Sequence, residues 1–178
     1  EYLKTQIGYV PQDDSIHRQL TVRQSLYYTA KLRLDNLKEI EIESKIDNIL
    51  NELGVMHIKD SLISTISGGQ RKRVCIALEL LSEPLVLFLD EPTSPLDPQT
   101  IEDFLNILKN LSKRGTTIIM VTHKPEDLEY MDEVLFLAKG GFPAYFGDSK
   151  NYKKYFGVKT AVSVFSLLSE NEWIEKYK

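Results

Sequence analysis

The sequence predicts an α/β fold in which a mostly parallel sheet is joined to a helical subdomain. Apolar runs with the length of strands alternate with helical patterns through the second half of the chain. One of these runs, Leu85–Leu89, ends directly in two acidic residues. The region 13–81 has helical spacing and no strong strand candidate. The predicted division is sheet core at 1–12, helical subdomain at 13–82, sheet core at 83–147 and helical tail at 148–178.

The first predicted elements are a short strand and two helices. Gln6–Val10 is predicted to be a strand, ended by the proline that follows it. Thr21 and Gln24 have the spacing of a capping box and predict a helix start. Isoleucines and leucines at helical spacing predict a second helix from about Glu39 to Leu53. Gly54 is then expected at its left-handed end.

The middle of the chain contains two more predicted helices and a strand between them. Apolar residues at helical spacing predict a helix that starts at Gly68-Gly69. The continuous apolar run Leu85–Leu89 is typical of a strand buried on both faces. Asp97 and Pro98 together predict the start of the next helix, which Gly115 ends.

The last part of the chain is predicted to hold a strand, a hairpin and a helical tail. Thr116–Thr122 is expected to be a second buried strand, followed by a short helix near Pro125–Tyr130. Glu133–Ala138 and Phe142–Phe146 are expected to form a hairpin, because the paired glycines between them tolerate positive φ. From Asp148 onward the chain is expected to be helical and to cover the domain.

The composition excludes several classes of protein. The 178 residues carry 22 Lys+Arg and 26 Asp+Glu, a net charge of −4, which is not the electrostatic pattern of a nucleic-acid-binding protein. The single cysteine cannot form an internal disulfide. The longest apolar runs are too short to cross a bilayer, and no signal peptide is evident. We therefore expect a soluble, intracellular domain.

Two adjacent acids carry the strongest chemical signal. Asp90 and Glu91 follow a predicted buried strand, so they lie at the carboxyl edge of the sheet, where α/β folds place their ligands. One carboxylate there can hold Mg²⁺ and the next can accept a proton from an attacking water. Acids after strands also serve as helix caps or solvated loop residues, so this pattern alone leaves both interpretations open.

Three further sites are suggestive only in combination. Ser67-Gly68-Gly69-Gln70 opens a helix, where free N–H groups and missing side chains favour an anion. His123 follows a predicted strand and could donate a hydrogen bond to a phosphate oxygen. Gln12 could reach a metal ion or a water through its amide. A glycine turn, a packing histidine and a surface glutamine are the ordinary alternatives.

The order of these motifs resembles that of an ATP-binding-cassette (ABC) ATPase domain, a P-loop NTPase, over nearly the whole chain. Gln12 resembles the Q-loop glutamine of that family, Ile66–Gln70 the signature loop, Val86–Glu91 the Walker B strand with the catalytic glutamate, Ser94–Asp97 the D-loop and His123 the switch histidine.

The resemblance implies ATP and Mg²⁺ as cofactors and a role for each matched residue. Asp90 would bind Mg²⁺ through water, and Gln12 would complete the metal's shell and sense the γ-phosphate. Glu91 would be the general base on the attacking water, and His123 would stabilise charge on the γ-phosphate.

The resemblance also implies a head-to-tail dimer with a second ATPase domain. ATP would lie between the phosphate loop of one domain and the signature residues of the other, which here are Ser67, Gly68, Gly69 and Gln70. Asp97 would couple the two sites across the interface.

Finer motifs resemble the G-type (white-like) branch of ABC exporters and its bacterial relatives. In that branch a transmembrane transporter domain usually follows on the same chain, which implies a location at the cytoplasmic face of the cell membrane. The motifs are Gly8–Asp14, Leu20–Val22, Arg71–Val74, Tyr145–Gly147 and Tyr155–Gly157.

Two departures from the family pattern stand out. Pro95 occupies a position where this branch usually has a small, flexible residue. No G-x-x-x-x-G-K-[ST] phosphate loop (Walker A) occurs in the sequence. The simplest explanation is that the chain is the C-terminal part of an ATPase domain. These residues alone are then expected neither to bind ATP tightly nor to hydrolyse it.

Two other functions are compatible with the motifs. A soluble ABC-type ATPase that acts on ribosomes or nucleic acid is one of them. The repair and chromosome classes insert a long coiled coil between the Q-loop and the signature. Here Gln12 and Ser67 are only 67 − 12 = 55 positions apart, without sustained heptads. A non-catalytic regulatory module is the other alternative.

The remaining reactive or basic residues have ordinary interpretations. Cys75 is expected to be a packing residue, and Arg71–Arg73 a solvated helix start with one residue able to touch a partner or phosphate. His17 and His57 lack a convergent ligand set. Trp173 is expected to dock the terminal helix.

Overall fold

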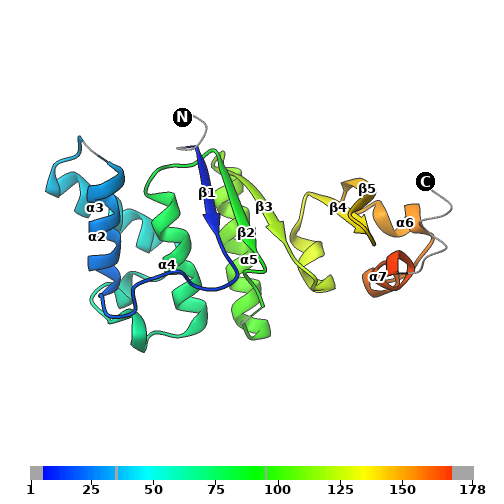
Figure 1. The fold of residues 1–178 in the computed structure, drawn as a ribbon, viewed down its shortest axis with the longest axis horizontal. Coiled ribbons are helices and arrows are strands. Elements are labelled where there is room, and N and C mark those ends of the chain that lie inside the picture. The colour runs from blue at the N-terminus through cyan, green and yellow to red at the C-terminus, as the bar shows by residue number, and fades with distance from the viewer. Residues whose placement is uncertain (1–5, 35, 95, 170–178) are drawn as a thin grey trace. The chain divides into compact units, whose positions relative to one another are not determined.

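The protein is described by a computed structural model that covers residues 6–34, 36–94 and 96–169 (Figure 1). The chain forms two compact units that divide between Thr122 and His123, and each unit is described by itself. This division falls inside the predicted sheet core at 83–147. The predicted four-part organisation of the chain stays a prediction.

The first unit is built on a three-stranded parallel sheet. Its strands are β1 (Ile7–Val10), β2 (Val86–Asp90) and β3 (Thr117–Val121), in the order β1-β2-β3. Val10 pairs with Leu89, and Asp90 pairs with Val121, so all three strands end at the same edge. The predicted α/β fold with a parallel sheet is therefore confirmed.

The sequence predicted that β2 and β3 are both buried strands. This prediction is wrong for β3 and half right for β2. Leu87 and Leu89 are buried, but the residues that alternate with them on β2 are only half-buried. No residue of β3 is fully buried, and Ile119 and Val121 are 43% and 58% exposed. β3 is the edge strand of the described sheet, so only β2 pairs with it.

Helices occupy the long segment between β1 and β2, as predicted. They are α2 (Val22–Arg33), α3 (Glu39–Glu52) and α4 (Gly68–Leu80), with the short 3₁₀ turns η1 (Met56–Ile58) and η2 (Ile63–Thr65) between α3 and α4. They pack on one another, and Leu26, Ile46 and Leu50 are completely buried. Burying three such side chains contributes about 5 to 9 kcal/mol before the cost of chain entropy.

The helix ends follow the local chemistry of the sequence. Thr21 and Gln24 form the predicted capping box of α2. Gly54, just beyond α3, has a φ of +67°, which only glycine adopts without strain. Asp97 caps α5 (Pro98–Lys113) by accepting the N–H of Thr100 at 3.1 Å. These ends fix where α2, α3 and α5 begin or stop.

The second unit is a hairpin covered by helices. After η3 (Pro125–Tyr130), the strands β4 (Glu133–Ala138) and β5 (Phe142–Asp148) pair antiparallel. The predicted hairpin is confirmed, with Gly140 and Gly141 at φ +88° and +79°. The short helices α6 (Tyr152–Phe156) and α7 (Ala161–Ser169) pack against it around Phe136. Trp173 and the rest of the predicted tail lie outside the described residues.

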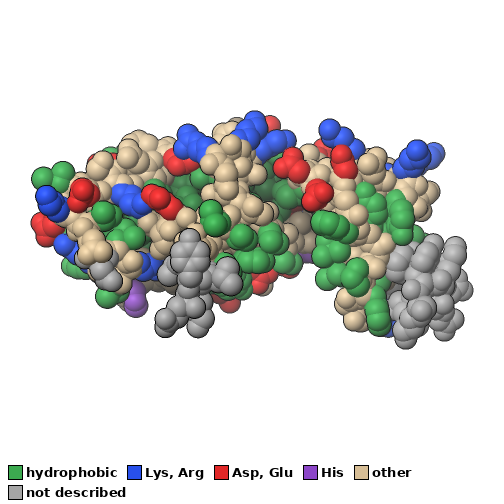
Figure 2. Space-filling view, turned by 90° about the horizontal axis from the view of Figure 1, so that it is seen from above, with side chains coloured by type: hydrophobic (Ala, Val, Ile, Leu, Met, Phe, Trp, Pro, Cys, Tyr) green, Lys and Arg blue, Asp and Glu red, His purple; other side chains and the backbone are tan. Residues whose placement is uncertain are grey.

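The described surface carries mixed charge. On the face drawn in Figure 2, Lys and Arg side chains lie among Asp and Glu side chains and form no single basic patch. Within the described ranges, no helix combines the length and the apolar character needed to cross a membrane. The same residues contain no cluster of three or more His, Cys, Asp or Glu suited to a metal ion.

Candidate functional site at the carboxyl edge of the parallel sheet

The end of β2 brings two acidic residues next to the loop that follows β1. The Gln12 Nε2 group donates a hydrogen bond to Glu91 Oε2 at 3.1 Å. The Tyr9 hydroxyl donates to Asp90 Oδ2 at 3.4 Å. The parallel pairing of β1 with β2 makes both contacts possible, since it carries residues about 80 positions apart to one sheet edge.

The backbone of Glu91 is strained. Its φ is +41°, in the left-handed region that residues other than glycine rarely adopt. The Glu91 N–H donates to the carbonyl of Val121 at 2.9 Å, which ties this residue to the end of β3. Strain of this kind persists where surrounding contacts hold it in place, and it is frequent at active sites.

The predicted signature loop is the start of α4. Ser67 Oγ accepts the N–H of Gln70 at 3.2 Å, and Gln70 Oε1 accepts the N–H of Ser67 at 3.0 Å. This reciprocal capping box fixes the first turn of the helix. The Gln70 amide nitrogen also lies 3.3 Å from His57 Nε2. His57 thus contacts the signature loop, a position that the sequence did not reveal.

The two signature glycines differ in their surroundings. A Cβ atom on Gly69 would lie 2.9 Å from Thr100 Cγ2 and 3.3 Å from Leu96, so the start of α5 requires a glycine here. A Cβ atom on Gly68 would meet nothing within 4 Å. Gly68 therefore has no packing reason to be glycine within this chain.

Asp97 lies beside the same helix start. Its carboxylate accepts hydrogen bonds from the hydroxyl and the N–H of Thr100, which hold the pKa of Asp97 below its usual value. Because Thr100 also lies against Gly69, the predicted D-loop residue and the signature loop share one neighbour.

The three basic residues after the signature do not form the solvated helix start that was predicted. Lys72 is 1% exposed, and its ammonium group donates to the carbonyls of Pro11 and Gln12 and to Asp14 Oδ1. The helical spacing of Lys72 from the buried residues Cys75 and Ile76 is the signal that could have predicted this burial.

Cys75 is buried beside Lys72, as predicted for a packing residue. Burial, and after it the nearby carboxylate of Asp14, raise the pKa of the Cys75 thiol to about 12. The sulfur lies 3.7 Å from Asp14 Oδ1. A thiol in this setting stays protonated and inert at neutral pH.

Two predicted positions lie elsewhere in the chain. His123 is the first residue of the second compact unit, and its predicted role at the γ-phosphate stays a prediction. Pro95 lies outside the described residues.

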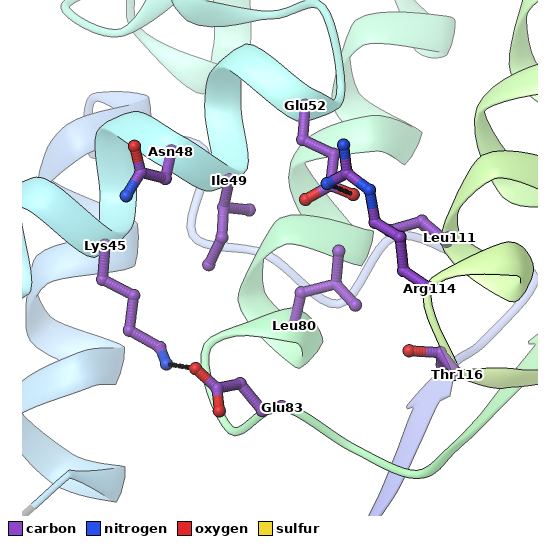
Figure 3. A pocket seen from close by; sticks show the side chains of 9 residues that line it. All are labelled: Lys45, Asn48, Ile49, Glu52, Leu80, Glu83, Leu111, Arg114 and Thr116. Carbon is purple, nitrogen blue, oxygen red and sulfur yellow. Dashed lines mark hydrogen bonds and ion pairs between the residues drawn. The ribbon is translucent and has the colours of Figure 1, made fainter.

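A hollow of about 370 Å³ lies at the opposite, amino end of the strands (Figure 3). Glu83, which precedes β2, and Thr116, which precedes β3, are on its wall. Lys45 of α3 pairs with Glu83 there, and Arg114 pairs with Glu52. The hollow is therefore separate from the edge that carries Gln12, Asp90 and Glu91.

The parallel sheet, with acids at its carboxyl edge and a glycine loop that opens a helix, defines an α/β domain of the class that places ligands at this edge. The family model described as "ABC transporter" matches residues 1–94, which is more than half of the chain. The chain therefore belongs to the ABC transporter family.

Individual relatives place the chain within this family. It is 41% identical over 158 residues to ABC transporter G family member 28 of Arabidopsis thaliana, covering 84% of this chain and 14% of that protein. It is 39% identical to an ABC transporter ATP-binding/permease protein of Mycobacterium tuberculosis, covering 95% and 20%. The chain is thus homologous to G-type transporters and spans at most a fifth of these two curated relatives.

A solved structure supports the fold assignment. The cbiO1 protein of Clostridium perfringens, described as part of the ABC transporter complex cbiONQ, matches with a TM-score of 0.79 and 35% identity. The match covers 93% of this chain and 65% of that one. The fold is therefore that of an ABC ATPase domain.

Proposed function

We propose that this chain is part of an ATPase domain that hydrolyses Mg²⁺-ATP and couples the hydrolysis to transport by a membrane domain. The observation that carries this proposal is the hydrogen bond between Gln12 and Glu91, beside Asp90, at the carboxyl edge of the sheet. This edge brings together Asp90, the predicted metal ligand, Gln12, the predicted sensor of the γ-phosphate, and Glu91, the predicted base.

The donor groups suit a magnesium ion. Asp90 offers a carboxylate and Gln12 an amide oxygen, and hard oxygen donors of this kind are the ligands that Mg²⁺ prefers. The Gln12 amide nitrogen is engaged with Glu91, which leaves the amide oxygen as the ligand. Asp90 would hold the ion through a bound water and Gln12 would hold it directly, which is possible because Mg²⁺ usually keeps several waters. When bound, the ion neutralises charge on the phosphates.

The protein residues would then divide the chemical work. Glu91 accepts the proton of the attacking water, and Gln12 orients Glu91 through their shared hydrogen bond. His123 stabilises charge that develops on the γ-phosphate. The start of α4, with Ser67 and Gly68, contacts the ATP held mainly by a second ATPase domain.

The proposed partners are a second ATPase domain and a transmembrane domain. A head-to-tail dimer of ATPase domains would complete each ATP site, with Asp97 at the interface. The ATP-binding/permease relative from M. tuberculosis supports a transmembrane domain on the same chain. The domain would lie at the cytoplasmic face of the cell membrane, without a nucleic-acid partner.

Hydrolysis assays on the full-length protein that contains this chain test the proposal. ATP hydrolysis should require Mg²⁺ and should fall about a hundredfold or more in Asp90→Asn. Asp103→Asn, at an exposed position of α5, changes the same chemical group away from the site and should be neutral. Full activity in Asp90→Asn would overturn the assignment of the metal ligand.

We also propose that residues 1–178 alone do not bind ATP tightly, because they contain no phosphate-loop lysine. Isothermal titration of Mg²⁺-ATP into this chain should give no micromolar binding. Micromolar affinity would show that the described site binds the nucleotide without that lysine.

A further inference from the structure

Lys72 joins the start of α4 to the loop that carries Gln12. Its ammonium group lies 3.1 Å from the Pro11 carbonyl, 2.9 Å from the Gln12 carbonyl and 3.0 Å from Asp14 Oδ1. An ammonium group has three N–H donors, so these three acceptors use all of them. The contact spans about 60 positions in sequence and connects two separate segments.

The two carbonyls belong to the two peptide groups on either side of the Gln12 Cα atom. A hydrogen bond to each peptide plane restricts the backbone dihedrals of Gln12, and these set the direction of its side chain. That direction leads to Glu91, which accepts the Gln12 amide N–H at 3.1 Å. Lys72 therefore acts on the predicted base through Gln12 and does not touch the base itself.

Burial makes this contact rigid. The Lys72 side chain is 1% exposed and that of Asp14 is 13% exposed, so water competes little with the three bonds. Losing one member of such a buried cluster leaves the others without partners, which is strongly unfavourable. The position of Gln12 is therefore tied to the position of α4.

We propose that Lys72 is a positioning residue for ATP hydrolysis, which holds Gln12 against Glu91 and makes the Q-loop move with the signature helix. This inference rests on the proposed function of Gln12 and Glu91. The signature residues Ser67–Gln70 lie just before Lys72 on the same rigid helix. A displacement of that helix start by a nucleotide or a partner domain is thereby passed to Gln12.

The test uses the full-length protein and a matched pair of variants on adjacent residues. Lys72→Met keeps most of the side-chain volume but removes all three hydrogen bonds. Arg73→Met removes a neighbouring cation that donates to the Leu53 carbonyl and, among the described residues, has no hydrogen bond or ion pair with the Q-loop. We expect Lys72→Met to lower kcat about ten- to a hundredfold, with KM for ATP changed less than about threefold. Arg73→Met should keep kcat within about threefold of the wild type.

Two further variants separate positioning from folding. Asp14→Asn/Lys72→Met removes both charges of the closer ion pair, and Arg71, whose guanidinium lies 3.8 Å from Asp14, keeps its hydrogen bond to the Ile66 carbonyl. The double variant should therefore fold where the single variant does not, and it should be as slow as Lys72→Met. Asp14→Asn alone keeps the two carbonyl bonds and should lose less than about threefold in kcat. Hydrogen exchange in a peptide spanning residues 8–16 should be faster in Lys72→Met and unchanged in Arg73→Met.

The outcomes distinguish this inference from the proposed function. If the folded Lys72→Met or the double variant keeps the wild-type kcat while Gln12→Ala is slow, Lys72 does not position Gln12. The same conclusion holds if kcat falls only in proportion to the folded fraction. If Gln12→Ala itself hydrolyses ATP at the wild-type rate, the proposed function of Gln12 is the part that fails.

Discussion

Strand β2 has a glutamate just beyond each end, and both residues have the same unusual backbone. Glu83 before the strand has a φ of +49°, and Glu91 after it has a φ of +41°. They are the two residues other than glycine with positive φ in the described part of the chain. Their surroundings differ: the Glu83 side chain is 80% exposed and pairs with Lys45, whereas Glu91 is half-buried against Gln12.

This difference shows that a strained backbone does not mark a functional site by itself. Glu83 lies at the amino end of the sheet, on the wall of the hollow in Figure 3, where its partner is one half-buried lysine, Lys45. Glu91 lies at the carboxyl end, where Asp90, Gln12 and the end of β3 converge. Several contacts hold the strain at Glu91, and this convergence supports the proposed catalytic role of Glu91.

The largest expected effect is on ATP hydrolysis by the full-length protein. Glu91→Gln should abolish steady hydrolysis, a loss of about a hundredfold or more, and should trap the ATP-bound dimer, because an amide cannot accept the proton. Glu83→Gln makes the same change at the other end of β2 and should leave turnover within about twofold. If the two substitutions lowered ATP hydrolysis equally, the proposed functional difference between the two ends of β2 would be wrong.

A second expected effect concerns how well the fold excludes water from Cys75, whose sulfur contacts Asp14 near the carboxyl end of the sheet. The thiol has a pKa raised from 9.0 to about 12, so at pH 9 the folded protein should react with maleimide about five hundredfold more slowly than the protein in denaturant. Because of this raised pKa, the folded protein binds the thiol proton of Cys75 more tightly than the unfolded chain does, and this difference stabilises the fold. This contribution of Cys75 to the free energy of unfolding is fully present below pH 9 and is lost as the pH rises towards about 12. Rapid labelling of the folded protein would mean that water reaches this cluster.

The sequence predicted the strands, helices and caps because their signals are local. Thr21 with Gln24, Ser67 with Gln70, and Asp97 with Pro98 each lie within a few residues of one another, and each forms the predicted helix start. The family could be predicted for the same reason, since each of its motifs is short and their order can be followed along the chain. Burial was predicted less well, because it depends on distant segments: β3 was expected to be buried and is instead an edge strand of the described sheet, with no fully buried residue.

Long-range contacts at the site were the other missed feature. Lys72 was expected in solvent because it stands between two arginines, and the acceptors that bury it lie about 60 positions earlier in the chain. The positive φ of Glu83 and Glu91 had no local signal, since glutamate is not a residue that favours it. The Lys72 contacts arise where α4 packs against β1 and the residues that follow it.

A third prediction tests whether the start of α4 faces a nucleotide, and it uses the two signature glycines. Gly68→Ala should leave stability unchanged or slightly higher, because nothing lies within 4 Å of the added methyl group. Its ATP hydrolysis should still fall about tenfold, since a phosphate needs close approach to the helix start. Gly69→Ala should lower the melting temperature, because its methyl group would press on Thr100. Wild-type hydrolysis in Gly68→Ala would indicate that no ligand approaches this glycine.

The smallest expected effect is on stability at the amino end of β2. Glu83→Gly relieves a positive φ that costs a residue other than glycine about 1 to 2 kcal/mol, and it removes an exposed ion pair with Lys45 worth about 0 to 1 kcal/mol. Because glycine also makes the unfolded chain more flexible, the net change should be a gain of at most about 1 kcal/mol. Thermal unfolding should show a small rise in melting temperature, and hydrolysis should be unchanged. Lys45→Ala, which removes the ion pair but keeps the strain, should show no such rise. If Glu83→Gly lowers the free energy of unfolding by more than about 1 kcal/mol, the Glu83–Lys45 ion pair stabilises this end of the strand by more than the strained backbone costs.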